Sequence, residues 1–314
     1  MQEVETASRV RKLEKIVVGI ATSDGAGVRL RRSLGTDHLP QLDPFLMLDE
    51  FRSDDPAAYI AGFPDHPHRG FETVTYMLAG RMRHKDNLGN SGVLGPGAVQ
   101  WMTAGRGIVH SEMPEQERGL MWGFQLWVNL PGRHKMTAPR YQEFAADAIA
   151  TVTGAQGVQV KVIAGAFGGV TGPVKAPAID AQYLDVTIAA GATFEHTLPA
   201  GHNACFYVYE GAVKLDGLKV RIGELGVLGR GETVVLRAAD DSPVRLLLLA
   251  GRPIEEPVAR YGPFVMNTRE EIQQAWYDYQ RTRFGGWPWP DEAPVHGREG
   301  RFARRPGSTL ERPT

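Results

Sequence analysis

Short apolar runs separated by glycine turns are the feature that most restricts the fold of this chain. The 314 residues include 37 Gly and 21 Pro, many of them at short intervals. Residues 71–78, 98–102 and 121–130 are rich in β-branched, aromatic or other apolar side chains, and each run adjoins such a turn. Runs of this length between turn signals are typical of strands in a sandwich or barrel. We therefore expect an all-β protein.

A weak internal repeat indicates two domains of the same kind. Residues 76–80 (YMLAG) resemble residues 207–211 (YVYEG), which lie 131 positions later. In each case a Gly-rich turn and an apolar run follow after the length of another strand. Because domains usually contain roughly 100–200 residues, we predict an N-terminal domain over residues 1–139 and a C-terminal domain over residues 140–314.

One helix is indicated near the C-terminus. Thr268 and Glu271 fit a capping box, in which the hydroxyl accepts from a free backbone N–H and the Glu side chain reaches back. The apolar residues that follow fall on one helical face: Ile272, Ala275, Trp276 and Tyr279. Because two glycines follow at 285 and 286, we predict a packing helix over residues 268–284.

Charge and composition narrow the classes of function. The formal net charge is -1, from 35 basic and 36 acidic side chains, which argues against direct nucleic-acid binding. The tail after Pro290 is basic, and we expect it to be a flexible, solvated terminus. Cys205 is the one cysteine, so no intrachain disulfide can form. The longest apolar stretch, residues 246–250, cannot span a membrane, and we expect a cytoplasmic protein.

Two pairs of side chains are the candidate metal ligands of the sequence. His66 and His68 flank Pro67, and His110 and Glu112 follow a Gly-rich turn. In an extended chain, residues two apart project to the same face, so each pair can point into one cavity. Pro67 cannot donate to a sheet ladder, so the first pair is expected at a strand start or a sheet edge.

Together these residues predict one metal site in the N-terminal half. Three imidazoles and one carboxylate suit a first-row transition metal, and they leave coordination positions open for catalysis. A structural zinc site is less favoured, since such sites prefer cysteine and a closed shell. The sequence contains neither a phosphate-binding loop nor the G-x-S-x-G motif of a hydrolase.

The remaining histidines are interpreted as surface or structural residues: His38, His84, His134, His196, His202 and His296. His84 is the best exception, because it can lie near the mouth of the cavity. His196 and His202 form no pair of the kind described above, so we expect the second domain to bind no metal.

Several blocks of the chain resemble the pirin family of the cupin superfamily. They comprise residues 43–51 (DPFLMLDEF), 66–76 (HPHRGFETVTY), 99–113 (VQWMTAGRGIVHSEM), 122–131 (WGFQLWVNLP) and 263–268 (PFVMNT). The resemblance extends from about Arg9 to Trp287, and the ligand motif does not depart from the family pattern.

The resemblance implies two cupin β-barrel (jelly-roll) domains, with a metal in the N-terminal one only. It implies iron as the usual ion, held by His66, His68, His110 and Glu112. Such a ligand set also accepts Mn, Ni, Co, Cu or Zn. Some family members open the flavonol quercetin with dioxygen and release carbon monoxide, whereas some animal members are iron-dependent partners of transcription factors.

These alternatives give two principal hypotheses for function. The first is a dioxygenase of quercetin-like flavonols, in which Glu112 is the catalytic base and the cavity rim is formed by Phe45, Met47, Trp101 and Met121. The second is a non-catalytic, iron-dependent regulatory protein that binds a protein partner. A metal-dependent isomerase of sugars is a third option, since cupins include such enzymes.

Overall fold

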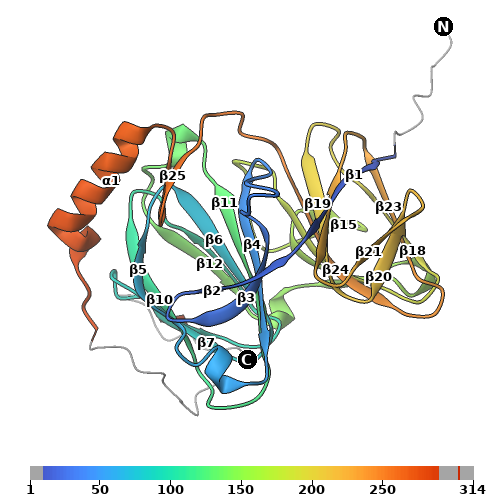
Figure 1. Ribbon diagram of the computed structural model, residues 1–314, viewed down its shortest axis with the longest axis horizontal. Helices are drawn as coiled ribbons and strands as arrows, with labels where there is room; N and C mark the ends of the chain where they lie inside the picture. Colours follow the sequence, from blue (N-terminus) through green and yellow to red (C-terminus); the bar gives the residue numbers. More distant parts are fainter. Residues whose placement is uncertain (1–9, 290–302, 305–314) are drawn as a thin grey trace, which may run out of the picture. The chain divides into compact units, whose positions relative to one another are not determined.

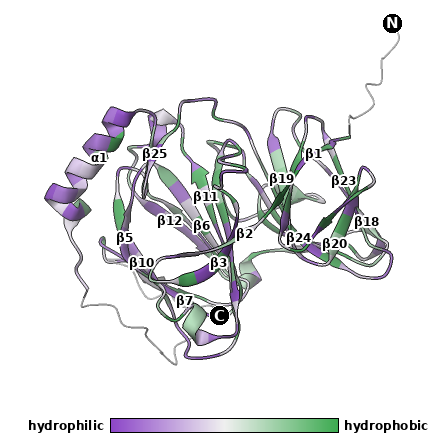
Figure 2. Cartoon of the chain, viewed as in Figure 1, coloured by the Kyte–Doolittle hydropathy of each residue, from purple (hydrophilic) through white to green (hydrophobic). Residues whose placement is uncertain are grey.

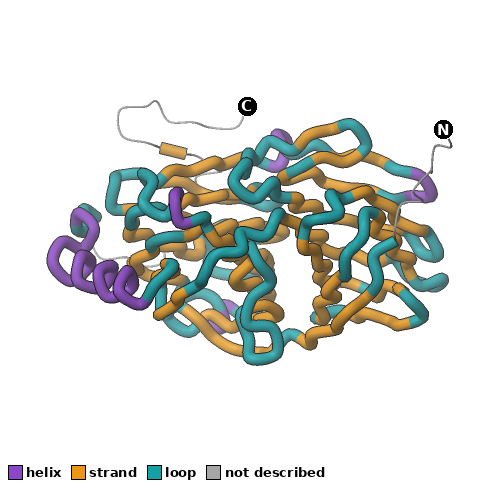
Figure 3. Tube along the Cα trace, turned by 90° about the horizontal axis from the view of Figure 1, so that it is seen from above, coloured by secondary structure: helices purple, strands orange, loops and turns teal. Residues whose placement is uncertain are grey.

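The computed structural model describes residues 10–289 and 303–304, which form strands with one long helix (Figure 1). The predicted all-β class is confirmed, and strands make up most of the described chain (Figure 3). The chain divides into two compact units. Unit 1 contains the described residues up to Gly19, residues 42–44 and residues 149–253. Unit 2 contains residues 20–41, residues 45–148 and the described residues from 254 onward.

Unit 2 contains two antiparallel sheets and a short hairpin. The seven-stranded sheet has the order β12 (Arg140–Phe144), β9 (Val99–Thr103), β6 (Phe71–Ala79), β11 (Met121–Asn129), β4 (Phe45–Ser53), β3 (Val28–Leu34), β2 (Ile20–Asp24). The five-stranded sheet has the order β27 (Ala303–Arg304), β8 (Ser91–Leu94), β7 (Met82–Asp86), β10 (Ile108–Pro114), β5 (Phe63–His68). The remaining elements are β25 (Ala259–Tyr261), β26 (Phe264–Met266), α1 (Arg269–Thr282) and the 3-10 turns 56–58, 132–134, 146–148 and 283–285.

Unit 1 likewise contains one large and one small antiparallel sheet. Its seven-stranded sheet has the order β1 (Leu13–Val18), β22 (Glu224–Leu228), β19 (Asn203–Glu210), β24 (Val244–Gly251), β17 (Gln182–Ile188), β14 (Gln159–Ala164), β13 (Thr151–Thr153). Its four-stranded sheet has the order β18 (Thr193–Thr197), β23 (Thr233–Ala238), β20 (Ala212–Leu215), β21 (Leu218–Arg221). A hairpin of β15 (Ala166–Phe167) and β16 (Val170–Thr171) and a 3-10 turn at 155–157 complete it.

The topology of the two large sheets accounts for the sequence repeat. Tyr76 lies on β6, which is flanked by β9 and β11, and Tyr207 lies on β19, which is flanked by β22 and β24. The Gly-rich turns of the repeat lead into β9 and β22, which hold the same place beside those central strands. The repeat therefore marks two copies of one architecture, as predicted.

The compact units do not coincide with the predicted ranges 1–139 and 140–314. β1 pairs along its length with β22 of unit 1, so the N-terminal strand does not belong to the unit formed by residues 45–148. Conversely, β25, β26 and α1 belong to unit 2, although they follow unit 1 in the sequence. Each unit is formed by segments that are distant in sequence, and no local sequence pattern predicts which of these segments pair.

The predicted C-terminal helix is confirmed. Thr268 caps α1 by accepting from the backbone N–H of Glu271, and the Glu271 side chain accepts from the backbone N–H of Thr268. Ile272 and Ala275 are buried, whereas much of the helix surface is hydrophilic (Figure 2). Arg283 ends the helix in the left-handed conformation. No helix of the described residues is long and apolar enough to cross a membrane.

Most of the predicted basic tail, including Arg298, Arg301 and Arg305, lies outside the described residues. The exception is the segment Ala303–Arg304, which pairs with Ser91 and Gly92 of β8. Within the described chain this segment forms an edge strand, whereas the sequence predicted a flexible terminus.

A buried lysine ties three segments of unit 2 together. Lys135 is 2% exposed, and its Nζ donates to Gly70 O at 2.8 Å, Asn129 Oδ1 at 2.7 Å and Val265 O at 3.1 Å. Gly70 has a φ of 88°, and a Cβ there would collide with the carbonyl oxygen of Val265. The chain that follows His68 therefore packs directly against β26.

Replacing Lys135 with Met is expected to destabilise the protein by about 2–3 kcal/mol, because buried acceptors would lose their ammonium donor. Urea unfolding followed by circular dichroism measures the change. Lys219→Met, at an exposed lysine, is the control and should change stability by less than about 0.5 kcal/mol. Equal effects of the two substitutions would contradict this structural role.

Candidate metal centre

The histidine pairs meet on two adjacent antiparallel strands. β5 is the edge strand of its sheet and pairs with β10, as the sequence predicted for the segment around Pro67. In this register His66 lies opposite His110, and His68 lies opposite Ile108. Directly opposed residues project to the same face of a sheet, so the three histidines point together.

The three imidazoles form a compact group. The ring centroids of His66 and His110 are 4.5 Å apart, those of His66 and His68 are 4.7 Å apart, and those of His68 and His110 are 5.0 Å apart. One nitrogen from each ring lies within 4.8 Å of the others, so the group could hold a metal ion. It is the one such group of at least three His, Cys, Asp or Glu residues among residues 10–289.

The hydrogen bonds of these rings fit a metal. The Nδ1 of His66 lies 2.7 Å from Pro64 O, so Nδ1 carries the proton and Nε2 presents a lone pair. His110 is fully buried, and neither of its ring nitrogens has a hydrogen-bond partner in the described chain. Because a buried nitrogen without a partner is costly, the donor set fits a divalent transition metal.

Burial also favours the neutral form of two of these histidines, His68 and His110. Desolvation lowers the pKa of His68 and of His110 well below the usual histidine range, and the neighbouring His66 lowers both further. A metal binds the neutral imidazole. His68 and His110 can therefore bind a cation at neutral pH without first losing a proton.

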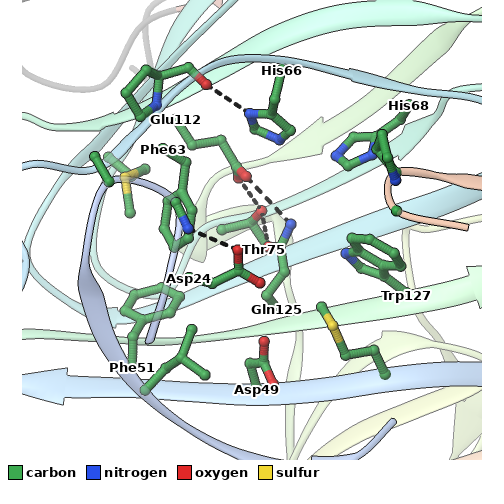
Figure 4. A pocket seen from close by; sticks show the side chains of 18 of the residues that line it. Asp24, Asp49, Phe51, Phe63, His66, His68, Thr75, Glu112, Gln125 and Trp127 are labelled. Carbon is green, nitrogen blue, oxygen red and sulfur yellow. Dashed lines mark hydrogen bonds between the residues drawn. The ribbon is translucent and has the colours of Figure 1, made fainter. Parts of the chain in front are cut away.

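Glu112 lies beside the histidines but outside their group. A register shift follows His110, so Glu112 pairs with Phe63 rather than continuing the regular ladder. Its Oε1 accepts from Thr75 Oγ1 at 2.7 Å, and its Oε2 accepts from Gln125 Nε2 at 3.3 Å (Figure 4). The extra residue of this shift lies on β5, and β10 stays in regular register with β7. The carboxylate faces Thr75 of β6 and Gln125 of β11, and its role as a metal ligand remains a prediction.

The site opens into a cavity of about 590 Å³ within unit 2. Its apolar walls are formed by Leu30, Met47, Phe51, Phe63, Met82 and Trp127. Its charged lining residues are Asp24, Asp49, Asp65, Glu112 and Arg260, and Thr75 and Gln125 add neutral polar groups. In Figure 4, Asp24 and Asp49 lie apart from His66 and His68, with Thr75 and Gln125 between them.

Only one of the four predicted rim residues lines this cavity. Met47 does so, whereas Phe45, Trp101 and Met121 do not. Those three side chains are each 1% exposed and pack in the core. An apolar pattern identifies buried positions, but it cannot distinguish a cavity wall from a filled core.

A C-terminal segment supplies part of the cavity that sequence reasoning missed. Arg260, Gly262 and Pro263 line it, although they follow the whole of unit 1 in the sequence. No motif in this segment signals a site. The nearest indication is that residues 263–268 belong to a block shared with the family that the chain resembles.

The other histidines are distributed as follows. His84 is buried on β7, and its Nε2 lies 2.8 Å from Glu143 Oε2, so it is a polar residue of the unit 2 interior. His202 lies 3.4 Å from Asp180, and His196 packs against aromatic rings of unit 1. His38 is exposed and His134 is half-buried. His296 lies outside the described residues.

The chain matches known proteins along most of its length. The Pirin family model matches residues 27–128, and the Pirin C-terminal cupin domain model matches residues 183–285. A pirin-like protein of Caulobacter vibrioides is 58% identical, over 88% of this chain and 99% of its own. Pirin of Mus musculus is 43% identical, over 88% of this chain and 94% of its own.

A solved structure supports the same fold. The crystal structure of quercetin 2,3-dioxygenase from Acinetobacter baumannii aligns with a TM-score of 0.82 and 33% identity, over 88% of this chain and 99% of that one. These matches confirm the predicted architecture of two cupin domains.

The low pKa values of His68 and His110 predict acid sensitivity of the metal-free protein. In the unfolded chain these two histidines bind protons near pH 6.5, whereas in the folded chain they bind them only at lower pH. The free energy of unfolding therefore falls as the pH drops below 6.5. Each such histidine contributes on the order of 1.4 kcal/mol per pH unit. Urea unfolding in the presence of a chelator at pH 7.5 and 5.5 measures the decline.

His110→Phe should reduce the loss of unfolding free energy between pH 7.5 and 5.5 by about 1 kcal/mol, because one of the two buried histidines is removed. His38→Phe, at an exposed histidine, should leave it unchanged. If His110→Phe and the wild-type protein lose stability equally between these pH values, the burial of His110 does not govern the acid response.

Proposed function

Since the chain belongs to the pirin family, we propose that it is a metal-dependent dioxygenase of quercetin-like flavonols, which opens the ring with dioxygen and releases carbon monoxide. The observation that supports this most is the joining of a three-histidine group to a cavity with aromatic walls. The related structure from Acinetobacter baumannii bears the name of this activity.

The shape and lining of the cavity suit a flat aromatic substrate. Phe51, Phe63 and Trp127 offer ring faces and edges, and a cavity of about 590 Å³ falls within the range of small-molecule sites. Stacking and edge contacts on such rings orient a planar molecule. Polar groups that could fix its orientation include Thr75, Gln125 and Asp49 on the large sheet and Arg260 on β25.

The proposed ion is Fe²⁺, held by His66, His68 and His110, with Glu112 as a further ligand. The bound ion would supply a Lewis acid that favours the anionic form of a coordinated substrate oxygen. Mn, Ni, Co, Cu or Zn could occupy the same donors, since metal availability decides as much as affinity.

Glu112 is the proposed catalytic base. Thr75 and Gln125 hold its two carboxylate oxygens in a buried position beside the histidines, at 2.7 Å and 3.3 Å. A carboxylate oriented in this way can accept the proton of the substrate's 3-hydroxyl group at Oε1 or Oε2. Thr75 and Gln125 then keep the accepted proton within a hydrogen-bonded set.

A non-catalytic role is the second candidate. Pirin of Mus musculus and a putative quercetin 2,3-dioxygenase of Vibrio cholerae are each 43% identical to this chain. An iron-dependent regulatory protein that binds a protein partner could therefore share this fold. The presence of a cavity with aromatic walls and an oriented carboxylate favours the enzyme. The substrate of the enzyme would be a polyphenol together with dioxygen.

Turnover of quercetin separates the two candidates. The iron-loaded wild-type protein should bleach quercetin absorbance under air and release carbon monoxide, but not under nitrogen. His66→Ala should lose bound iron and lower the rate about 100-fold or more, because it removes a direct metal ligand. Metal analysis and absorbance spectroscopy give the two readouts.

His134→Ala is the matched control, because this histidine is half-buried and does not line the cavity. It should retain both iron and activity. Stoichiometric iron in the wild-type protein without consumption of quercetin or related polyphenols would refute the dioxygenase and leave the regulatory role.

Glu112→Gln tests the proposed base separately from the metal. The amide keeps the size of the side chain but cannot accept the proton, so kcat should fall by roughly 10²–10⁴-fold. Because Glu112 is also a proposed ligand, kcat is measured per bound iron at saturating Fe²⁺, which the three remaining histidines should hold. If kcat is unchanged while iron is retained, Glu112 is not the base.

A further inference from the structure

Arg260 is the one basic side chain that lines the cavity among the residues that the structure describes. It lies on β25, beside the segment of Gly262 and Pro263, and shares the lining with His66 and His68. The other charged lining residues are acidic. A cation in this position is a distinct chemical feature of the cavity wall.

The exposed guanidinium of Arg260 lies over an aromatic ring and has few hydrogen-bond acceptors. Its central carbon lies 4.7 Å from the ring centroid of Trp127, which in turn contacts His68 edge to face at 5.3 Å. Its two hydrogen bonds are long, at 3.4 Å to Leu46 O and 4.0 Å to Met47 Sδ. A guanidinium carries five N–H donors, so most of its donor capacity is available to a ligand.

The nearby Arg32 is different. Its Nε and Nη2 bind the two carboxylate oxygens of Asp49 at 2.8 Å and 2.7 Å, and Nη2 also lies 2.9 Å from Asp24. Two carboxylates therefore bind Arg32 directly. The same carboxylates also act electrostatically on Arg260, but its two hydrogen bonds go to Leu46 O and Met47 Sδ. The charge of Arg260 reaches the metal end of the cavity, since it contributes to the lowered pKa of His68 after burial and His66.

We propose that Arg260 determines substrate specificity by binding an anionic oxygen, a carboxylate or a phenolate, on an aromatic substrate. The planar fork of a guanidinium matches such an oxygen group, and charge-assisted pairs are stronger than neutral ones. The contact with the Trp127 ring places the fork beside the aromatic walls. This inference rests on the proposed function, because it names a feature of the substrate that the same cavity accepts.

A purely structural role is the alternative. The contacts with Leu46 and Met47 join β25 to β4, so removing the side chain could loosen the cavity wall. Such loosening would weaken the binding of every aromatic ligand. A specific role would weaken only the binding of an anionic one, and a matched pair of probes separates these cases.

Binding to the metal-free protein tests the inference without iron or dioxygen. Isothermal titration calorimetry at pH 8 measures the Kd of 2-naphthoate and of its neutral isostere, naphthalene-2-carboxamide. The wild-type protein should bind naphthoate more tightly than the carboxamide. Arg260→Met should weaken naphthoate binding about tenfold or more and leave carboxamide binding unchanged.

Two variants act as controls. Arg52→Met removes a guanidinium that also stacks on a tryptophan, at 3.9 Å from the Trp122 ring centroid, but that does not line the cavity, and it should change neither Kd. Arg260→Lys keeps the charge but loses the fork, so naphthoate binding should fall by less than in Arg260→Met. Circular dichroism confirms that each variant is folded.

Three results would overturn the inference: no preference of the wild-type protein for naphthoate, an equal loss of both probes in Arg260→Met, or a preference that survives in Arg260→Met. Failure of the proposed function shows itself separately, as iron-loaded protein that does not consume quercetin. The two hypotheses can therefore fail independently.

Discussion

The antiparallel register between β5 and β10 is the constraint on which the candidate site depends. It places His66 opposite His110 and brings three imidazoles to one face. A slip by one residue would turn the side chains of one strand to the other face. The pairing of β10 with β7 is regular through these residues, so Glu112 lies on the same face as His110, where its carboxylate accepts from Thr75 and Gln125. The pairing of β10 with its two neighbours therefore sets both the face that carries the histidines and the position of the Glu112 carboxylate.

The same architecture also occurs in the chain with a filled interior. The small sheets have the corresponding orders β5-β10-β7-β8 and β18-β23-β20-β21 in the two units. Where β5 and β10 carry histidines, the paired strands β18 and β23 carry Phe194, Val234 and Leu236, which are fully buried in the apolar core of unit 1. Both units therefore have an interior between their sheets, and the size and polarity of the inward side chains determine whether that interior is a packed core or a cavity.

The sequence correctly predicted those features of the structure that depend on residues close together in the chain. Strand class and the capped helix at Thr268 follow from periods of two and 3.6 residues, and the structure confirms them. The period of two also predicted the same-face pairs, and the structure brings His66, His68 and His110 together. The rim was mostly wrong, and Arg260 was missed, because both depend on which distant segments meet. The placement of β1 and of β25 in their units is also a matter of tertiary pairing, which a single sequence does not display.

A row of polar side chains crosses the cavity face of the large sheet. Thr75 of β6, Gln125 of β11, Asp49 of β4 and Arg32 of β3 are successive register partners. The Asp49 side chain is only 3% exposed, and burial is the main cause of its raised pKa. Replacing a buried ion pair with well-packed apolar residues is often neutral or stabilising, so stability alone does not account for this row. Because departures from an apolar interior concentrate at functional sites, the row is better explained by the cavity, where it supplies polar groups that extend from Glu112 to Asp49.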